Sequence, residues 1–408
     1  MRITMSREEI KQIKVMEQFK RGEISQKTAA ELMGKSVRTV RRKYTRYKTH
    51  GVPGLAHQSR GKKSNRKLSE DKRKAIVELA KTKYMNFGPT FMAEKLAENE
   101  HIKINRETLR LLLIDKELWK KQRKRVKHRQ WREPKEHCGQ MVQLDGSRHI
   151  WVSGSGTYWT LIKIIDDATG KVFARFYPSE SYEHVADLTI RYIKTYGKPA
   201  SIYTDCGGVF KVNKSNENND YITQYERALG AIGIVLIHAY SPQAKGRVER
   251  SFQTDQDRLV KELSLRSVTS MEKANEYLES EYLKNHNAKY ARQAKNPIDI
   301  HSPYQGKDLV DIFAIISTRR VANDWTIRYN NKILQIDSTR PVIVKPKDTI
   351  TVHERLDGII YLTIRSIPVT YKEIASKLIQ KKDVDKPLLQ IPYKPKIDHP
   401  WKRTRICY

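Results

Sequence analysis

The sequence predicts a multidomain protein with helical modules at its N-terminus, an α/β core with a mixed sheet, and a small all-β domain. Apolar residues recur with helical spacing through the first 120 residues. Short Val- and Ile-rich runs then alternate with helical segments between 138 and 302, and hairpin-like runs follow from 315 to 368. A length of 408 residues is sufficient for two to four such domains.

The charge of the chain indicates a polyanionic partner. The formal net charge is +33, from 79 basic and 46 acidic residues, and most of the excess falls in residues 1–140. Nucleic acid is favoured over a membrane, because no apolar run approaches the roughly 18 residues of a spanning helix. The plainer alternative is a ribosome-associated or merely soluble basic protein.

The cysteines and the first residues indicate an intracellular protein. Cys138, Cys206 and Cys407 are scattered, and they form neither a disulfide framework nor a CxxC zinc pattern. The first ten residues, MRITMSREEI, contain no apolar signal core.

Residues 1–52 are expected to form a helix-turn-helix domain. In SQKTAAELMGKSVRTVRRKYTRYK, Ala30 suits a helix crossing, Gly34 a turn that needs positive φ, and Val40 the seat of the second helix. The other face of that helix would contact the major groove and phosphates through Arg38, Thr39, Arg41, Arg42, Lys43 and Arg46. The alternative is a solvated basic helix in an ordinary bundle.

Residues 67–120 are expected to form a second helix-turn-helix or winged-helix-like module. Pro89 opens one helix and Asn105 caps the next, which directs Arg106 and Arg110 outward as DNA contacts. A helical linker bundle without base contacts is the alternative. Residues 121–137, very rich in Lys and Arg, are interpreted as a basic linker along the duplex.

The core, residues 138–302, carries three acids in different settings. Asp145 and Asp205 lie at the ends of strand-like runs, and Glu249 lies on a predicted helix that opens near Pro242. Acids from two strand ends and one helix can meet above a sheet, where each pair of carboxylates repels by roughly 4 kcal/mol at an effective dielectric near 20. We therefore expect all three to bind Mg²⁺ or Mn²⁺, two ions per site, which clamp the attacking and leaving oxygens of a displacement at phosphorus.

The stretches TDCGGVF and YSPQAKGRVERSF resemble the core of the DDE transposases and retroviral-type integrases. The second is similar to insertion-sequence transposases of the ISNCY kind. The resemblance covers about residues 140–300 and implies an RNase H-like catalytic core with Asp145, Asp205 and Glu249 as its triad. The chain departs from the family at Cys206, where many relatives have Asn, and at Gln256, where a basic residue is familiar. The interval from Asp205 to Glu249 is also longer than the usual family spacing. The run KVNKSNENND is expected to be an inserted loop that accounts for the excess.

Other polar residues near the triad are weaker candidates. Lys245 and Arg247 are expected to touch the scissile phosphates. Asp166 and Asp167 compete as metal ligands but are interpreted as turn formers, because Asp before Gly is common at hairpins. For His238 and Ser241, a core or turn role is favoured over positioning of DNA or of the triad helix.

The C-terminal part is expected to be largely β-structure. Residues 268–300 would close the core as a helix. Five strands are expected in WTIRY, KILQI, PVIVK, TITVH and IIYLTI. Turns at Asn330–Asn331 and Asp357–Gly358 indicate hairpins, and the set suggests a small SH3-like barrel over 315–368. Residues 369–408 are interpreted as a basic tail that stays extended or disordered until it meets DNA or another subunit.

The resemblance implies a DNA transposase that binds the terminal inverted repeats of an insertion sequence, cleaves their 3′ ends and transfers the strands into target DNA. The expected partners are double-stranded DNA, as transposon ends and target, and further copies of the chain in a homodimer or higher multimer, with no membrane. The expected location is the bacterial cytoplasm, in association with the nucleoid. Two alternatives stay open: a DNA-binding regulator that has lost catalysis, and an RNase H-like nuclease without strand transfer.

Overall fold

The computed structural model describes residues 5–57, 68–120, 133–152, 154, 156–212, 222–239, 246–337 and 342–374. The chain divides into two compact units, Met1–Arg123 and Lys124–Tyr408. Within the described ranges, no helix is both long and apolar enough to cross a membrane.

The first unit begins with the predicted helix-turn-helix. Its helices are α1 (Arg7–Lys20), α2 (Gln26–Met33) and α3 (Val37–His50), followed by a 3₁₀ turn (Val52–Leu55). A serine caps each helix by accepting the backbone N–H three residues later. Gly34 ends α2 with φ 59°, as the turn requires. The buried core consists of Met16, Ala29, Ala30, Val40 and Leu55.

A second three-helix module follows in the same unit. It contains α4 (Glu70–Lys81), α5 (Pro89–Asn99) and α6 (Arg106–Asp115). Pro89 lies at the start of α5, and the Asn105 side chain caps α6 by accepting the Glu107 N–H at 2.9 Å. Residues 68–120 contain no strand, so the winged-helix alternative is not supported for this segment.

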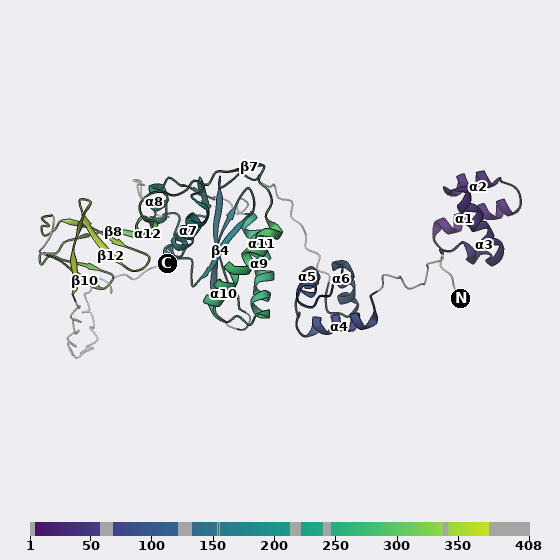
Figure 1. Ribbon diagram of the computed structural model, residues 1–408, viewed down its shortest axis with the longest axis horizontal. Coiled ribbons are helices and arrows are strands. Elements are labelled where there is room, and N and C mark those ends of the chain that lie inside the picture. Colours follow the sequence, from purple (N-terminus) through teal and green to yellow (C-terminus); the bar gives the residue numbers. More distant parts are fainter. Residues whose placement is uncertain are drawn as a thin grey trace, which may run out of the picture. The chain divides into compact units, whose positions relative to one another are not determined.

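The second unit contains a five-stranded mixed sheet in the order β4-β3-β2-β5-β6. Strand β4 of this sheet is labelled in Figure 1. The strands are β2 (Val142–His149), β3 (Trp159–Asp166), β4 (Val172–Tyr177), β5 (Ser201–Thr204) and β6 (Val235–His238). The first three form an antiparallel meander, and β5 and β6 continue the sheet parallel to β2. This arrangement confirms the RNase H-like core.

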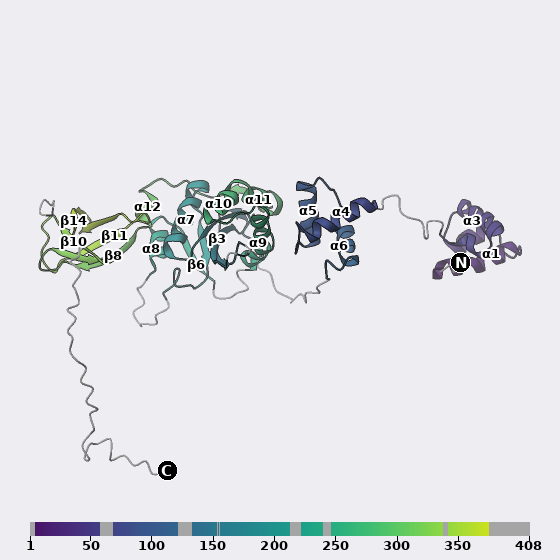
Figure 2. The ribbon, with the colours of Figure 1, turned by 90° about the horizontal axis from the view of Figure 1, so that it is seen from below.

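Helices cover both faces of this sheet (Figures 1 and 2). One face packs against α7 (Tyr182–Tyr196) and α8 (Gln224–Ala231). The other packs against α9 (Gly246–Leu265), α10 (Met271–Tyr277), a π-helical turn (Leu278–Tyr282) and α11 (Leu283–Tyr290). Because side chains alternate along a strand, Val142 and Leu144 point to the α7 face while Asp145 points to the α9 face.

The predicted helix over 268–300 is too long. It ends at Tyr290, and Ala291 is already extended, with ψ 151°. Residues Asn296–Asp299 form strand β7, which pairs in parallel with β1 (His137–Cys138). Pro297 is incompatible with a continued helix. Neither strand was predicted, because runs of two to four residues carry no readable period.

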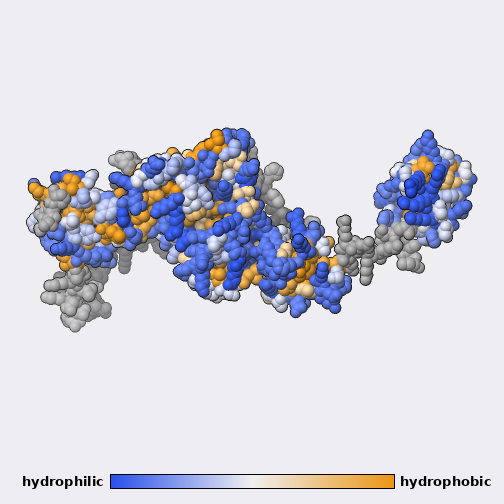
Figure 3. All heavy atoms as spheres, viewed as in Figure 1, coloured by the Kyte–Doolittle hydropathy of each residue, from blue (hydrophilic) through white to orange (hydrophobic). Residues whose placement is uncertain are grey.

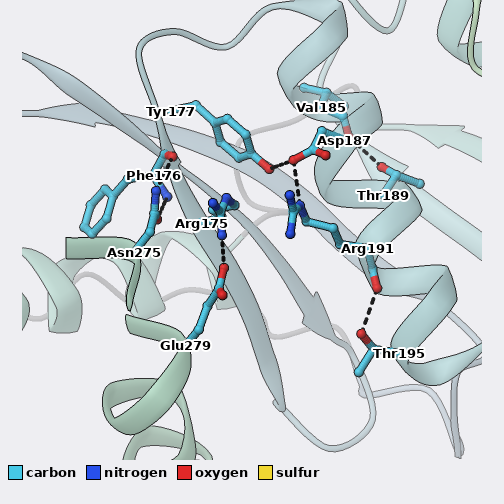
Figure 4. A network of polar contacts seen from close by, with 10 residues as sticks. All are labelled: Arg175, Phe176, Tyr177, Val185, Asp187, Thr189, Arg191, Thr195, Asn275 and Glu279. Atoms are coloured by element: carbon cyan, nitrogen blue, oxygen red, sulfur yellow. Dashed lines mark hydrogen bonds and ion pairs between the residues drawn. The ribbon is translucent and has the colours of Figure 1, made fainter. Parts of the chain in front are cut away.

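Two asparagines protect the exposed edge of the sheet at β4. Asn275 of α10 accepts the Phe176 N–H at 2.8 Å and donates to its carbonyl at 3.1 Å (Figure 4). Asn287 of α11 makes the same pair with Val172, at 2.8 and 2.9 Å. These side chains take the place of a neighbouring strand, so the edge is closed to further pairing.

The C-terminal part is all-β, as predicted, after a short helix α12 (Leu309–Ile312). One sheet has the order β13-β12-β11-β8 and the other β14-β10-β9, and both enclose one apolar core. The strands are β8 (Ile315–Arg320), β9 (Thr326–Tyr329), β10 (Lys332–Ile336), β11 (Thr349–Glu354), β12 (Ile360–Ile364), β13 (Ile367–Val369) and β14 (Tyr371–Ile374).

Several details of this domain differ from expectation. Residues 342–345 of PVIVK are not a strand, although Val344 is buried in the core. Strands β8, β13 and β14 were not predicted, and β14 carries the domain past 368 into the expected tail. Both predicted turns are confirmed, since Asn330, Asn331 and Gly358 all have positive φ. Residues 375–408 lie outside the described part.

Candidate functional site

The strand register brings Asp145 and Asp205 to neighbouring positions. Strands β2 and β5 are parallel, with Gln143 paired to Tyr203. Two residues further along both strands, this register places Asp145 beside Asp205, just past the end of β5. Adjacent strands lie about 4.8 Å apart, and residues two apart share a face, so both aspartates belong to the α9 face.

Helix α9 follows β2 in the same direction. Arg247 meets Asp167 next to Gln143, Ser251 meets Lys163 opposite Asp145, and Gln256 meets Ser147. The position of Glu249, between Arg247 and Ser251 along the helix, is therefore level with the Asp145 region of β2.

The flank of α9 that carries Glu249 faces β2. At 100° per residue, Glu249 and Gln256 share one flank of the buried face, while Arg247 and Ser251 share the other. Gln256 donates to Ser147 on β2 at 3.0 Å, which identifies its flank as the one toward β2 and β5. The three acids thus approach the same region of the α9 face of the sheet from two strands and one helix.

The carboxylate oxygens themselves are spread apart. Among the described residues, the triad is not one of the groups whose ligand atoms all lie within 4.8 Å of one another. Asp205 accepts the N–H of Gly207 at 2.8 Å, and Asp145 accepts that of Gly146 at 3.1 Å. The strand register nevertheless keeps the backbone positions of the two aspartates side by side.

A buried ion pair lies next to Asp145. Lys163, which pairs with Asp145 from the neighbouring strand β3, is 0% exposed and contacts Asp255 of α9, which is 2% exposed. Lys163 also donates to Ser251 at 2.8 Å. Burial lowers the pKa of Lys163, and the charges of Asp255 and Asp145 oppose this effect. The pair joins β3 to α9 and so fixes the helix that carries Glu249.

The ion pair belongs to a larger buried network. Tyr282 donates to Asp255 at 2.8 Å, and the His286 Nε2 lies 3.7 Å from the same carboxylate. Burial lowers the pKa of His286, against the opposing charge of Asp255. Burial also raises the pKa of Tyr282 well above its ordinary value. In this network, α11 and the π-helical turn hold α9 from behind.

Asp166 and Asp167 have structural roles, as interpreted. Asp166 accepts the Thr169 N–H and hydroxyl at 2.7 Å each and the Gly139 N–H at 2.9 Å. Asp167 accepts from Gln143 at 2.7 Å and forms an ion pair with Arg247. Arg247 lies on the flank opposite Glu249, and its contact with scissile phosphates stays a prediction. Lys245 and Ser241 lie outside the described residues.

The two residues that depart from the family pattern, Gln256 and Cys206, both contact neighbouring elements. Gln256 links α9 to β2 by donating to the Ser147 hydroxyl, although the residue itself is exposed. The Cys206 Sγ lies 3.6 Å from the Ala239 carbonyl, which links the loop after β5 to the end of β6. The Nδ1 atom of His238 is buried and has no hydrogen-bond partner among the described residues.

Helix α3 presents part of the predicted DNA-binding face. Arg38, Arg41 and Arg42 are exposed, and the visible surface of this three-helix unit is mostly hydrophilic (Figure 3). Lys43 is half-buried and donates to Gln12 of α1, so it supports the bundle. The Thr39 and Ser36 hydroxyls are 2.9 Å apart at the cap of the helix. Arg46 is half-buried.

In the second module, Arg106 is exposed at the start of α6. Arg110 forms a two-bond ion pair with Glu107, at 2.6 and 2.8 Å. The guanidinium is therefore partly neutralised at the surface.

Sequence reasoning missed the residues that hold the site together. Lys163 lies within the largely apolar strand WTLIKIID, which is buried along its whole length. A lysine in such a run indicates that a buried acidic partner must be present, and the sequence could have shown this. Asp255 had no such signal, because it lies among other polar residues of α9. Only the fold brings the two together.

Several known proteins are similar to this chain. A homeodomain-like domain model matches residues 39–113. The catalytic core domain of the HTLV-2 integrase, in complex with magnesium, is 18% identical and covers 41% of this chain and 98% of its own, with a TM-score of 0.30. The transposase for insertion sequence IS1202 of Streptococcus pneumoniae is 26% identical and covers 97% of this chain and 94% of its own length.

A more similar relative is the putative transposase y4bF of Sinorhizobium fredii. It is 36% identical over 363 residues, which are 87% of this chain and 79% of the relative. Identity at this level and coverage, together with the helix-turn-helix and the mixed-sheet core, establishes that the chain belongs to the family of insertion-sequence transposases.

Proposed function

We propose that this transposase binds the terminal inverted repeats of its insertion sequence, cleaves their 3′ ends and transfers the strands into target DNA, using Asp145, Asp205 and Glu249. The observation that carries this proposal is the register of β2 and β5, which aligns the two aspartates on the face covered by α9. Membership of the family supports the proposed substrate, and the strand register supports the proposed site.

The donor set fits a hard divalent cation. Asp145, Asp205 and Glu249 offer only carboxylate oxygens, which Mg²⁺ and Mn²⁺ prefer. When bound, two such ions would stabilise the charge that develops on the attacking and leaving oxygens. The spread of the three carboxylates is compatible with this role, since a cation removes the repulsion that separates them.

The remaining residues bind, orient and support. Arg38, Arg41 and Arg42 on α3 contact the end DNA, with Arg106 as a further contact from α6. Lys163 and Asp255 fix α9 against β3, which orients Glu249 relative to the aspartates. Gln256 fixes the same helix to β2. A reaction at two transposon ends calls for at least two copies of the chain, so we propose a homodimer or higher multimer on DNA in the cytoplasm.

The test uses single isosteric changes at each acid: Asp145→Asn, Asp205→Asn and Glu249→Gln. Each variant should lose Mg²⁺-dependent end cleavage and strand transfer by at least about 1,000-fold, because the removed charge holds the cation. Binding to end DNA should persist in a mobility-shift assay. Asp257→Asn, an exposed acid on the same helix, serves as the matched control and should retain activity.

The same assay distinguishes the alternatives. Strand transfer retained in a triad variant would remove that residue from the proposed site. Cleavage without joining of a supplied 3′-hydroxyl end would favour a nuclease, and wild-type binding without any cleavage would favour a regulator.

A further inference from the structure

A second group of metal-ligand side chains lies away from the triad, where the core begins and ends. Cys138 of β1 and Asp299 of β7 are paired across the two parallel strands, and His301 follows two residues after Asp299. One potential ligand atom from each of the three lies within 4.8 Å of the others. The sequence showed no zinc pattern here, because the cysteine and the other two residues are far apart in the chain.

The histidine is held in place by its surroundings. Its side chain is 5% exposed, its Nε2 lies 2.8 Å from the Tyr192 hydroxyl, and its Nδ1 lies 2.6 Å from Asp299. Gly139 packs against the ring so closely that a Cβ at that position would lie 2.6 Å from Nδ1. A histidine whose second nitrogen is fixed by a hydroxyl has the arrangement of a metal ligand with an outer hydrogen bond.

The three side chains also line a small cavity. Its volume is about 30 Å³, enough for one ion or water, and its other lining residues include Asp166, Tyr192 and Lys171. The lining includes two carboxylates, from Asp166 and Asp299, and one lysine, Lys171, which is exposed to solvent. The cavity therefore favours a cation.

We propose that Cys138, Asp299 and His301 form a binding site for a borderline-soft divalent metal, of which Zn²⁺ is the representative. Zn²⁺ takes thiolate, imidazole and carboxylate ligands at roughly 2.0–2.3 Å, which places tetrahedral donors about 3.3–3.8 Å apart. The His301 Nδ1 and the Asp299 carboxylate oxygen, now 2.6 Å apart, would have to separate by roughly 1 Å to bind the same ion. Water would complete the coordination through the cavity.

The site differs from the catalytic site in chemistry and in role. Mg²⁺ prefers all-oxygen sites, whereas thiolate and imidazole select Zn²⁺ or Co²⁺. The ion would join β1 to β7 and, through His301, to Tyr192 of α7. Ser302 continues this junction by pairing with Lys198, just before β5. The metal would thus have a structural role and cross-link the first and last strands of the core, β1 and β7.

The competing explanation is a metal-free hydrogen-bond chain. In it, the Cys138 thiol and the His301 ring both donate to Asp299, and Tyr192 donates to His301. The two explanations differ in metal stoichiometry and in the optical spectrum of a cobalt derivative.

The experiment is equilibrium dialysis of the tag-free, full-length chain against Zn²⁺ with Mg²⁺ in large excess, followed by elemental analysis. The wild type should retain one zinc per chain and show a higher thermal midpoint with zinc than without it. Cys138→Ser and His301→Asn should lose the bound zinc, and Tyr192→Phe should weaken binding by roughly 10–100-fold. The controls Cys206→Ser and Asp145→Asn should bind zinc as the wild type does.

Cobalt substitution covers the case in which a ligand variant fails to fold. The Co²⁺ form of the wild type should show a thiolate-to-metal charge-transfer band, which persists in Cys206→Ser. No retained zinc in the wild type, zinc retained in folded Cys138→Ser, or a cobalt spectrum without the thiolate band would overturn the proposal. Each of these results leaves the triad proposal untouched, because that one is tested by Mg²⁺-dependent cleavage.

Discussion

Lys163 and Asp255 form an ion pair that is shielded from solvent between β3 and α9. Removing one partner of such a pair leaves an uncompensated charge in the interior, whereas replacing both by apolar groups can be nearly neutral. Because Lys163 of this pair lies beside Asp145 on the neighbouring strand, the pair contributes both to the stability of the core and to the geometry of the proposed site.

The first residue-scale prediction concerns this pair. Lys163→Met should lower the free energy of unfolding of the core by about 3–5 kcal/mol, because it leaves the Asp255 carboxylate buried without its cation. The double variant Lys163→Met/Asp255→Leu should recover most of that loss. Urea unfolding followed by the fluorescence of buried Trp151 and Trp159 measures both. A single variant as stable as the wild type would show that water reaches the pair.

A second prediction at this scale follows from His286. Burial lowers its pKa in the folded state below the ordinary value of 6.5, so the unfolded chain takes up the proton first as pH falls. The stability contributed by the neutral ring is therefore present above pH 6.5 and is lost as pH falls through the folded-state pKa. The loss has a limiting slope of about 1.4 kcal/mol per pH unit.

The matched variant is His286→Phe, which keeps a ring between Tyr282 and Tyr290. Its free energy of unfolding should lack this slope when it is measured by urea titration from pH 7.5 to 5. Parallel losses in variant and wild type would assign the pH dependence to other groups.

At the scale of elements, the turn between α2 and α3 sets the direction of the DNA-binding helix. Gly34 ends α2 at φ 59°, and a Cβ built there meets nothing within 4 Å. A substitution at this position is therefore governed by backbone conformation and not by crowding.

Gly34→Ala should destabilise the helix-turn-helix by about 1–2 kcal/mol, the cost of the left-handed conformation for a residue with a Cβ. Gly34→Asn is the matched control, because Asn tolerates this conformation better. Hydrogen exchange of the α2 and α3 amides measures the loss of stability. A mobility-shift assay with end DNA measures the effect of the substitution on DNA binding. Equal behaviour of the two variants would exclude backbone strain as the cause.

The elements also show what the sequence could predict. Helices with periodic apolar faces, such as α6 with Leu109, Leu112 and Leu113, were predicted within a few residues. Strands β1 and β7 were missed because they are short and gain their partners only from the fold. The expected strand in PVIVK failed for a related reason, since apolar residues such as Val344 can fill a core without pairing.

The same distinction applies to the candidate site. The three acids could be named from their settings in strand-like runs and on a helix, but Asp145 lies within β2 and not at its end, as was expected. Lys163 and Asp255 could not be paired in advance, because they are separated by 92 residues and meet only across the sheet. For the same reason, the ion pair of Arg247 with Asp167 could not be predicted.

At the scale of the whole molecule, the excess positive charge and the proposed catalytic acids lie in different parts of the sequence. Most of the excess positive charge belongs to residues 1–140, while the proposed acids come from distant parts of the core. We propose that Asp145, Asp205 and Glu249 share bound cations although long stretches of chain divide them. The two strands already align the aspartates, and α9 brings the glutamate to the same level.

The most direct test is iron-mediated cleavage of the polypeptide itself. Fe²⁺ replaces Mg²⁺ in the full-length chain, ascorbate and peroxide generate radicals at the bound ion, and mass spectrometry locates the cuts. The account predicts three clusters of cuts, near Asp145, Asp205 and Glu249, which all disappear with excess Mg²⁺ and in Asp205→Asn. Cuts around one of these residues without the other two, or cuts that survive in Asp205→Asn, would contradict a shared metal site.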